Sequence, residues 1–287
     1  MHISPIQFNN SHIARSFKGN SDKAQSSFIQ NYQYIPYMTP AKNKPDEYQK
    51  GQIVNSKGEI FNRHNTEFCR ADMNWKKLED ILRKKYPNPD NVNFIIYAAS
   101  TGEEPYTIAI LLNKIYGKPI PIKAFDISKD VIEENIKKQK EGVFIDIKDV
   151  RKIYETLNLG DFNSCFRADR TSGDIKIDRK ITDSIEFSQS NIIEDIDLID
   201  SEKPTVLFAR NMWPYVHFTQ YKGFCKKLNE KLTPNSLFII GSYDYNGEVG
   251  FLNSNDFPRI LTKNGFRGIS NRFFESFKTL DLIFEKK

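Results

Sequence analysis

Hydrophobic and polar positions along this chain alternate between two periods, which predict strands and helices in turn. Short, nearly continuous apolar runs are typical of strands that are buried on both faces of a sheet. The predicted strands lie at 92–98, 120–125, 206–209 and 236–240. Helical spacing of the apolar positions predicts helices at 65–86, 104–116, 129–141 and 220–232. Strands that alternate with helices predict an α/β fold with a mostly parallel sheet.

Segment 162–187 departs from this alternation. It contains three short apolar-polar stretches, at 164–168, 174–178 and 183–187, and Thr171-Ser172-Gly173 is typical of a hairpin turn between the first two. We therefore predict a small β insertion at about 162–187 on the surface of the main sheet. Alternating residues near the end of the chain predict one or two closing antiparallel strands.

Three regions are predicted within the 287 residues. Residues 1–45 are rich in Ser, Asn, Gln and Lys without a clear period, which predicts an irregular N-terminal arm. Residues 46–88 form a small helical region, because two prolines at 87 and 89 prevent its helix from continuing. Residues 89–287 hold the alternating strands and helices and form the main domain.

Composition narrows the class of protein. Hydrophobic residues make up 39% and charged residues 28%, and no apolar run is long enough for a membrane-spanning helix, so we expect a globular protein without membrane insertion. Three widely spaced cysteines and four scattered histidines predict neither a disulfide framework nor a metal site. The expected setting is cytoplasmic. A net charge of +5 suits an acidic partner and is too small to indicate nucleic acid.

The strongest chemical signal is the sequence Ala-Ala-Ser-Thr-Gly-Glu-Glu-Pro-Tyr at 98–106, where a predicted strand turns into a helix. Gly102 lets the backbone approach a ligand, and the helix N-terminus offers free N–H groups. Glu103 and Glu104 oppose a diphosphate and favour a positively charged group, such as an α-ammonium. The alternative is that both glutamates only complement the helix dipole.

Asp126 ends the next predicted strand, about 20 residues after the glycine turn, where such folds bind ribose hydroxyls. The alternative is that Asp126 caps the following helix, a position for which Ser128 competes. An ammonium site and a ribose site in one crevice together suggest S-adenosylmethionine.

Four blocks of sequence resemble the CheR family of S-adenosylmethionine-dependent methyltransferases, which esterify glutamates of bacterial chemoreceptors. The blocks are 66–70 with Trp75 and Leu78; 99–106; 125–128 with 142–144; and 185–187 with Asn191, 208–211, Tyr215 and 237–241. The second block is nearly the family's consensus. The resemblance covers about residues 60–287 and implies a Rossmann-like methyltransferase sheet, a small N-terminal helical domain and a small β subdomain.

The resemblance also implies the site. Its cofactor, S-adenosylmethionine, leaves as S-adenosylhomocysteine, and the implied cofactor-binding residues are Thr66, Arg70, Ala99, Gly102, Glu104, Asp126, Asn191, Ile192, Asn211 and Met212. Arg70 and Tyr215 are the candidate catalytic residues. The alternatives are a domain-linking salt bridge for Arg70 and ordinary packing for Tyr215.

The implied partner is an acidic, chemoreceptor-like protein, and the β insertion matches the subdomain on which some members dock a receptor peptide by strand addition. Three segments depart from the family's pattern: His64, the loop 209–216 with Pro214, and residues 241–244. They keep two alternatives open. One is methylation of another protein or of a small molecule, and the other is a non-catalytic cofactor-binding sensor.

Overall fold

The computed structural model describes residues 66–169, 172–200, 202–213, 216, 218–245, 256–269 and 282–287. It also describes four short strands, β1 (Ile53–Val54), β2 (Ile60–Phe61), β11 (Phe273–Glu275) and β12 (Lys278–Leu280). The predicted arm at 1–45, Pro214 and Tyr215 lie outside the described residues.

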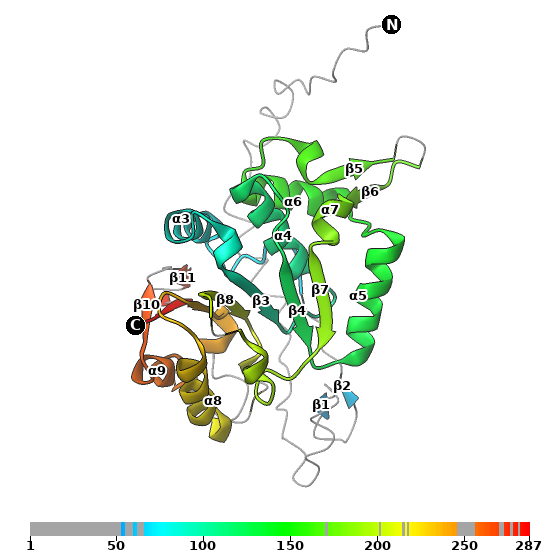
Figure 1. Cartoon of the computed structure of the whole chain (residues 1–287). Helices are drawn as coiled ribbons and strands as arrows, with labels where there is room; N and C mark the ends of the chain where they lie inside the picture. Colours follow the sequence, from blue (N-terminus) through cyan, green and yellow to red (C-terminus); the bar gives the residue numbers. More distant parts are fainter. Residues whose placement is uncertain are drawn as a thin grey trace, which may run out of the picture. The chain divides into compact units, whose positions relative to one another are not determined.

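A seven-stranded sheet forms the centre of the fold (Figure 1). Its strands, in spatial order, are β10 (Phe266–Ile269), β13 (Ile283–Lys286), β9 (Leu237–Ile239), β8 (Thr205–Ala209), β3 (Asn93–Tyr97), β4 (Ile122–Asp126) and β7 (Ile185–Gln189). β13 is the one strand of this sheet that runs in the direction opposite to the other six. The predicted parallel sheet with a closing antiparallel strand is therefore confirmed. The strand order reverses at β3, which places a topological switch point, the usual ligand crevice of α/β sheets, between β3 and β8.

Helices connect these strands. They are α3 (Trp75–Lys85), α4 (Glu103–Tyr116), α5 (Lys129–Glu141), α6 (Ile147–Leu157), α7 (Arg179–Thr182), α8 (Phe218–Lys231) and α9 (Asp256–Lys263). Short 3₁₀ turns occur at Pro89–Asn91, Phe162–Ser164, Ile196–Leu198 and Ser242–Tyr245. The predicted helices at 104–116, 129–141 and 220–232 are confirmed, whereas α6, α7 and α9 were not predicted.

The helix predicted at 65–86 begins only at Trp75. The side chain of Asn74 accepts a hydrogen bond from the backbone N–H of Lys77 at 2.9 Å and so caps the helix there. Residues 66–73 form turns instead. This correction matters for function, because Arg70 and Asp72 then lie on a loop that can reach the sheet.

The centre of the sheet is buried on both faces, because β3, β8 and β9 are apolar at nearly every position rather than at alternate ones. On β3, Phe94 and Ile96 join a core with Leu78 of α3 and Leu112 of α4. Ile95 joins the opposite core, which contains the apolar residues of α8 and α9. The sheet therefore has helices on both sides, as an α/β fold requires (Figure 1).

The β insertion is smaller than predicted. Strands β5 (Phe166–Ala168) and β6 (Ile175–Ile177) form the expected hairpin. The third predicted segment, 183–187, instead supplies β7, which pairs in parallel with β4 at the edge of the main sheet. Segment 143–145 takes its place beside β6, with Ile145 N donating to Ile175 O at 2.9 Å. Short amphipathic segments fit either sheet, so the sequence pattern could not decide between them.

Candidate active site

The loop between β3 and α4 turns sharply. Ala98, Ser100 and Gly102 all have positive φ, at 58°, 49° and 101°. Gly102 is required twice over, because a Cβ at this position would lie 2.5 Å from Asn135 Oδ1 and 2.7 Å from the Tyr106 ring. Ala99 is fully buried, and its N–H donates to Phe125 O of β4 at 2.9 Å. The loop is thereby held against the end of the neighbouring strand.

Asp126 joins the ends of β3 and β4. Its Oδ2 accepts a hydrogen bond from Ser100 N, and its Oδ1 accepts one from Ser128 N, both at 2.9 Å. Ser128 occupies the N-cap position of α5 without a side-chain capping bond. Asp126 therefore organises both loops through backbone N–H groups. Each carboxylate oxygen can accept a second hydrogen bond, so a ribose hydroxyl is compatible with this arrangement.

The two adjacent glutamates do not act as a pair. Glu103 Oε2 accepts a hydrogen bond from the Thr101 hydroxyl at 2.6 Å, so Glu103 is tied to its own loop. Glu104 points instead to the loop that follows β8, where its Oε2 accepts from Arg210 Nη1 at 3.0 Å. Of the two glutamates, only Glu104 therefore directs its charge toward the loop that follows β8.

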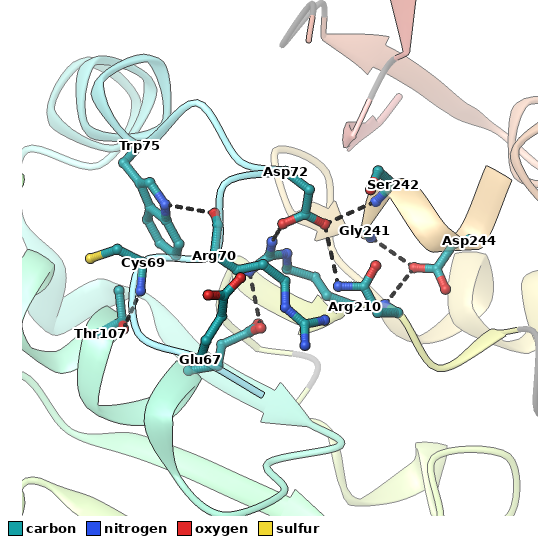
Figure 2. Close-up of polar contacts among 12 residues, drawn as sticks. Glu67, Cys69, Arg70, Asp72, Trp75, Thr107, Arg210, Gly241, Ser242 and Asp244 are labelled. Carbon is teal, nitrogen blue, oxygen red and sulfur yellow. Dashed lines mark hydrogen bonds and ion pairs between the residues drawn. The ribbon is translucent and has the colours of Figure 1, made fainter. Parts of the chain in front are cut away.

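A buried charge cluster surrounds Arg210 (Figure 2). Arg210 follows β8 directly and bridges two carboxylates, because its Nη1 contacts Glu104 and its Nη2 contacts Asp72. The side chains of Arg210, Asp72 and Glu104 are only 1%, 10% and 14% exposed. Trp75 covers the guanidinium at 5.6 Å and donates from Nε1 to Arg70 O at 3.1 Å. The segment before α3 is thereby attached to the cluster.

Asp244 organises the loops that follow β8 and β9. Its carboxylate accepts hydrogen bonds from Gly241 N at 2.7 Å, Asn211 N at 2.8 Å and Trp213 N at 3.0 Å. Asn211 itself has a positive φ of 57° and donates from Nδ2 to Asp72 at 3.3 Å. Asp244 and Asp72 together fix both the backbone and the side chain of Asn211.

Burial dominates the electrostatics of this cluster. It raises the pKa of Glu104, against the opposing positive charges of Arg210 and Arg70. It also raises the pKa of Asp244 to about 7, although three backbone N–H groups act in the opposite direction. The negative charges of Asp72 and Glu104 outweigh burial at Arg210 and raise its pKa. Arg210 is therefore the permanent positive charge at the centre of the cluster.

One buried carboxylate oxygen of the cluster has no hydrogen-bond donor within the described part of the chain. Glu104 Oε1 finds no hydrogen-bond donor among the described residues. A buried carboxylate oxygen without a donor is costly, and a ligand ammonium group would supply the missing donor. This orphaned oxygen fits the α-ammonium end of S-adenosylmethionine.

The remaining predicted site residues differ in their contacts and burial. Asn191 lies two residues after β7, where its N–H donates to Asp195 at 2.8 Å and its Oδ1 accepts from Ile193 N at 3.0 Å. Ile192 is buried, and the half-buried Met212 packs against the same apolar cluster. Thr66 is half-buried.

Sequence reasoning missed three residues of the cluster, namely Asp72, Arg210 as an ion-pair partner, and Asp244. One signal was available for Arg210, because a charged residue directly after the apolar strand at 205–209 indicates the carboxyl edge of the sheet. Asp72 and Asp244 gave no comparable signal. Each lies in a polar loop whose position depends on tertiary packing.

Among the described residues, no group of three or more His, Cys, Asp or Glu side chains could hold a metal ion. None of the helices in the described ranges is long and apolar enough to cross a membrane.

The chain is similar to known methyltransferases. The family model of the CheR methyltransferase, SAM binding domain, matches residues 64–249. Chemotaxis protein methyltransferase 2 of Pseudomonas aeruginosa is 26% identical over 211 residues, or 72% of this chain and 70% of that protein. The chemotaxis protein methyltransferase of Borreliella burgdorferi is 25% identical over 203 residues, or 66% of this chain and 67% of that protein. A solved structure of the glycopeptide N-methyltransferase MtfA with sinefungin is 10% identical, with a TM-score of 0.43 over 75% of this chain and 85% of that one.

The fold and the family match define an α/β enzyme of the class that uses S-adenosylmethionine. Because the family model covers well over half of the sequence, the chain belongs to the CheR methyltransferase family. It is an S-adenosylmethionine-dependent methyltransferase.

Proposed function

We propose that this methyltransferase esterifies glutamate carboxylates of an acidic, chemoreceptor-like protein. The observation that carries the proposal is the position of Arg70, whose positive charge lies close enough to Glu104 to act on its pKa. A cation beside the cofactor's ammonium site suits a carboxylate acceptor. The relatives named chemotaxis protein methyltransferase support the same acceptor.

The cofactor residues are part of this proposal. Glu104 would accept from the ammonium group, Asp126 from the ribose hydroxyls, and the loop of Ala99 and Gly102 would lie against the methionyl portion. Asn191 and Ile192 would flank the adenine. Thr66, Asn211 and Met212 would line the remainder of the cleft.

The chemistry requires little of the protein beyond positioning. S-Adenosylmethionine supplies a methyl group that its sulfonium has already activated. A glutamate carboxylate has an ordinary pKa of about 4.3 and is therefore ionised, and nucleophilic, at neutral pH without a general base. Arg70 would orient the acceptor oxygen toward the methyl carbon, and the closed cleft would exclude water. Tyr215 stays a predicted neighbour of the reacting groups.

Docking of an acidic peptide on the β insertion belongs to the proposal as well. Strand β5 pairs with β6 along one edge only, among the described strands, which leaves its other edge for strand addition. A cavity of about 470 Å³ nearby is lined by Lys114, Arg167 and Lys180, with Asp178 opposing them. Arg167 is paired with Asp178 and Lys114 with Glu79, so Lys180 is the lining cation that would attract an acidic peptide.

The proposed setting is cytoplasmic, and the division into an arm, a small N-terminal region and a main domain also stays a prediction. All three cysteines are buried free thiols, which is compatible with a reducing compartment.

Ester formation tests the proposal directly. The enzyme is incubated with methyl-labelled S-adenosylmethionine and the signalling fragment of a chemoreceptor, and label released at alkaline pH is counted, because only esters release it readily. We expect release from the native fragment and none from a fragment whose acceptor glutamates are changed to glutamine. Cofactor binding without ester formation would instead favour another acceptor or a non-catalytic sensor.

Arg70→Ala separates orientation from cofactor binding. We expect turnover at saturating cofactor to fall by about tenfold or more, because the acceptor loses its orienting cation. The exposed Arg151 on α6 provides the matched control, and Arg151→Ala should keep wild-type turnover. Unchanged turnover in Arg70→Ala would contradict the role proposed for Arg70.

A further inference from the structure

We infer that Asp72 is a positioning residue that sets the affinity of the site for the cationic end of S-adenosylmethionine, by holding Arg210 partly away from Glu104. The inference rests on the role proposed above for Glu104. It assigns a function to a residue that neither contacts the expected reacting atoms nor lies on a helix or strand of the structure.

Asp72 connects three segments that are far apart in the sequence. Its Oδ1 contacts Arg210 Nη2, and its Oδ2 accepts from Asn211 Nδ2 at 3.3 Å and from Ser242 N at 3.0 Å (Figure 2). It therefore joins the loops after β8 and β9 to the segment that carries Arg70, two residues earlier. Movement of Asp72 would displace all of these groups together.

The charge balance explains why an acidic residue is needed here. Arg210 divides its two amino groups between Asp72 and Glu104, so Glu104 receives only one of them and its Oε1 keeps no donor among the described residues. If Asp72 were neutral, the guanidinium could pair fully with Glu104, and the cluster would no longer attract a cation. In a buried site with a low dielectric, that difference is large.

Asp72→Asn tests the role of the charge. The amide retains the size of the side chain and can still accept from Ser242 N, so the loops keep most of their contacts. We expect the Kd for S-adenosylmethionine, measured by calorimetry, to rise by about tenfold or more. The KM for the cofactor should rise in parallel, whereas kcat at saturating cofactor should change by less than about threefold.

A matched control exists on α3. Asp80 is an exposed carboxylate that pairs with Lys76 at 2.8 Å, and Asp80→Asn should leave the Kd for the cofactor within about twofold of wild type. Because both variants remove one negative charge, a difference between them reflects position rather than net charge.

The pH dependence gives a second readout that a purely structural role would not change. Three charged side chains face Glu104. Arg210 faces it from the loop after β8, and Asp72 and Arg70 face it from the segment before α3. Asp244 lies beyond Arg210. Cofactor affinity should fall as acid protonates Glu104. The negative charge of Asp72 raises the pKa of Glu104, so the midpoint of that fall should move to lower pH in Asp72→Asn.

Two outcomes would overturn the inference. One is a folded Asp72→Asn variant, confirmed by its Tm, with wild-type affinity and an unchanged pH midpoint. The other concerns Asp72→Glu, which keeps the charge and should bind the cofactor with a Kd within about threefold of wild type. This variant tests the inference if Asp72→Asn does not fold. An equally large loss of affinity in Asp72→Glu would show that charge is not the determinant. Failure of the wild type itself to bind the cofactor would instead contradict the role of Glu104.

Discussion

Gly241 lies two residues after β9, and the side chain of Asn211 occupies the space where a Cβ would stand. A Cβ on Gly241 would approach Asn211 Oδ1 to 1.9 Å, although the φ of Gly241 is not in the left-handed region. The glycine is thus required by close approach rather than by backbone conformation. Asn211 cannot move aside freely, since Asp72 and Asp244 both hold it.

Gly241→Ala should therefore displace Asn211 and break its contact with Asp72. We expect a loss of about 1–3 kcal/mol in the free energy of unfolding, as in other overpacked sites, together with weaker cofactor binding. Urea unfolding and calorimetry measure the two effects. Gly223→Ala on α8 is the control, because a Cβ there meets no atom within 4 Å, and a stabilisation of up to about 1 kcal/mol is expected. Equal effects of the two substitutions would contradict this account.

Single site residues were predicted correctly at the start of α4 and were missed on the loops. Gly102 and Glu104 were placed at the strand-to-helix turn, because a glycine and an acid there have few other uses. Asp72 and Arg210 carry no local signature of pairing, since 138 residues separate them. Such a pair follows only from the approach of two loops in space.

Helix α3 illustrates how an element is attached to the sheet. Leu78 and Leu82 are fully buried, and between them Glu79 is only 5% exposed. Glu79 binds Lys114 of α4 at 2.7 Å and Arg83 at 3.0 Å. These contacts, together with the positive charges nearby, hold the pKa of Glu79 below its usual range despite the burial that opposes them. The helix is therefore fixed to α4 by an ion pair as well as by apolar packing.

Glu79→Ala should destabilise the protein by about 1–3 kcal/mol, because Lys114 would keep a partly buried charge without its carboxylate. The midpoint of urea unfolding measures this loss. Asp80→Ala, one residue further along the same helix, should leave the midpoint unchanged, since that carboxylate is exposed. A similar loss from both changes would contradict the role given to the buried ion pair.

Elements were predicted where the period was long and clear, and missed where it was short. The strand at 185–189 was assigned to the β insertion because an edge strand of the main sheet has the same mixed pattern as a hairpin strand. Helix α6 has a regular apolar face of Val150, Ile153 and Leu157 and was overlooked, although its spacing was available in the sequence.

The whole molecule should show the buried carboxylates in its response to pH. Asp244 has a pKa raised from 3.8 to about 7 in the folded state, so the native protein binds a proton more tightly than the unfolded chain. Stability should therefore fall as pH rises from about 4 to about 7, and this contribution should level off above that range. The lowered pKa values of Glu79 and Glu285 act with the opposite sign and at lower pH, where acid removes their stabilisation.

Asp244→Asn isolates this effect. The Tm of the wild type should decrease between about pH 5 and pH 8 more steeply than the Tm of Asp244→Asn, which has no ionisable group at this position. The variant should also be less stable overall, because its amide can present an N–H to the backbone donors that the carboxylate satisfied. The slopes, rather than the absolute Tm values, are compared. Parallel curves for the two proteins would contradict the raised pKa of Asp244.

The sequence by itself determined the class of fold, the glycine turn with Glu104, the acid that ends the second strand of the main sheet, and the resemblance to the CheR family. These features are local, because they depend on periodicity and on residues that are adjacent in the chain. Tertiary structure alone decided that Glu103 turns away, that β7 joins the main sheet, and that Asp72, Arg210 and Asp244 form one cluster with Glu104. Charges on separate loops pair only after the sheet brings its carboxyl edge together, and burial then gives those charges their strength.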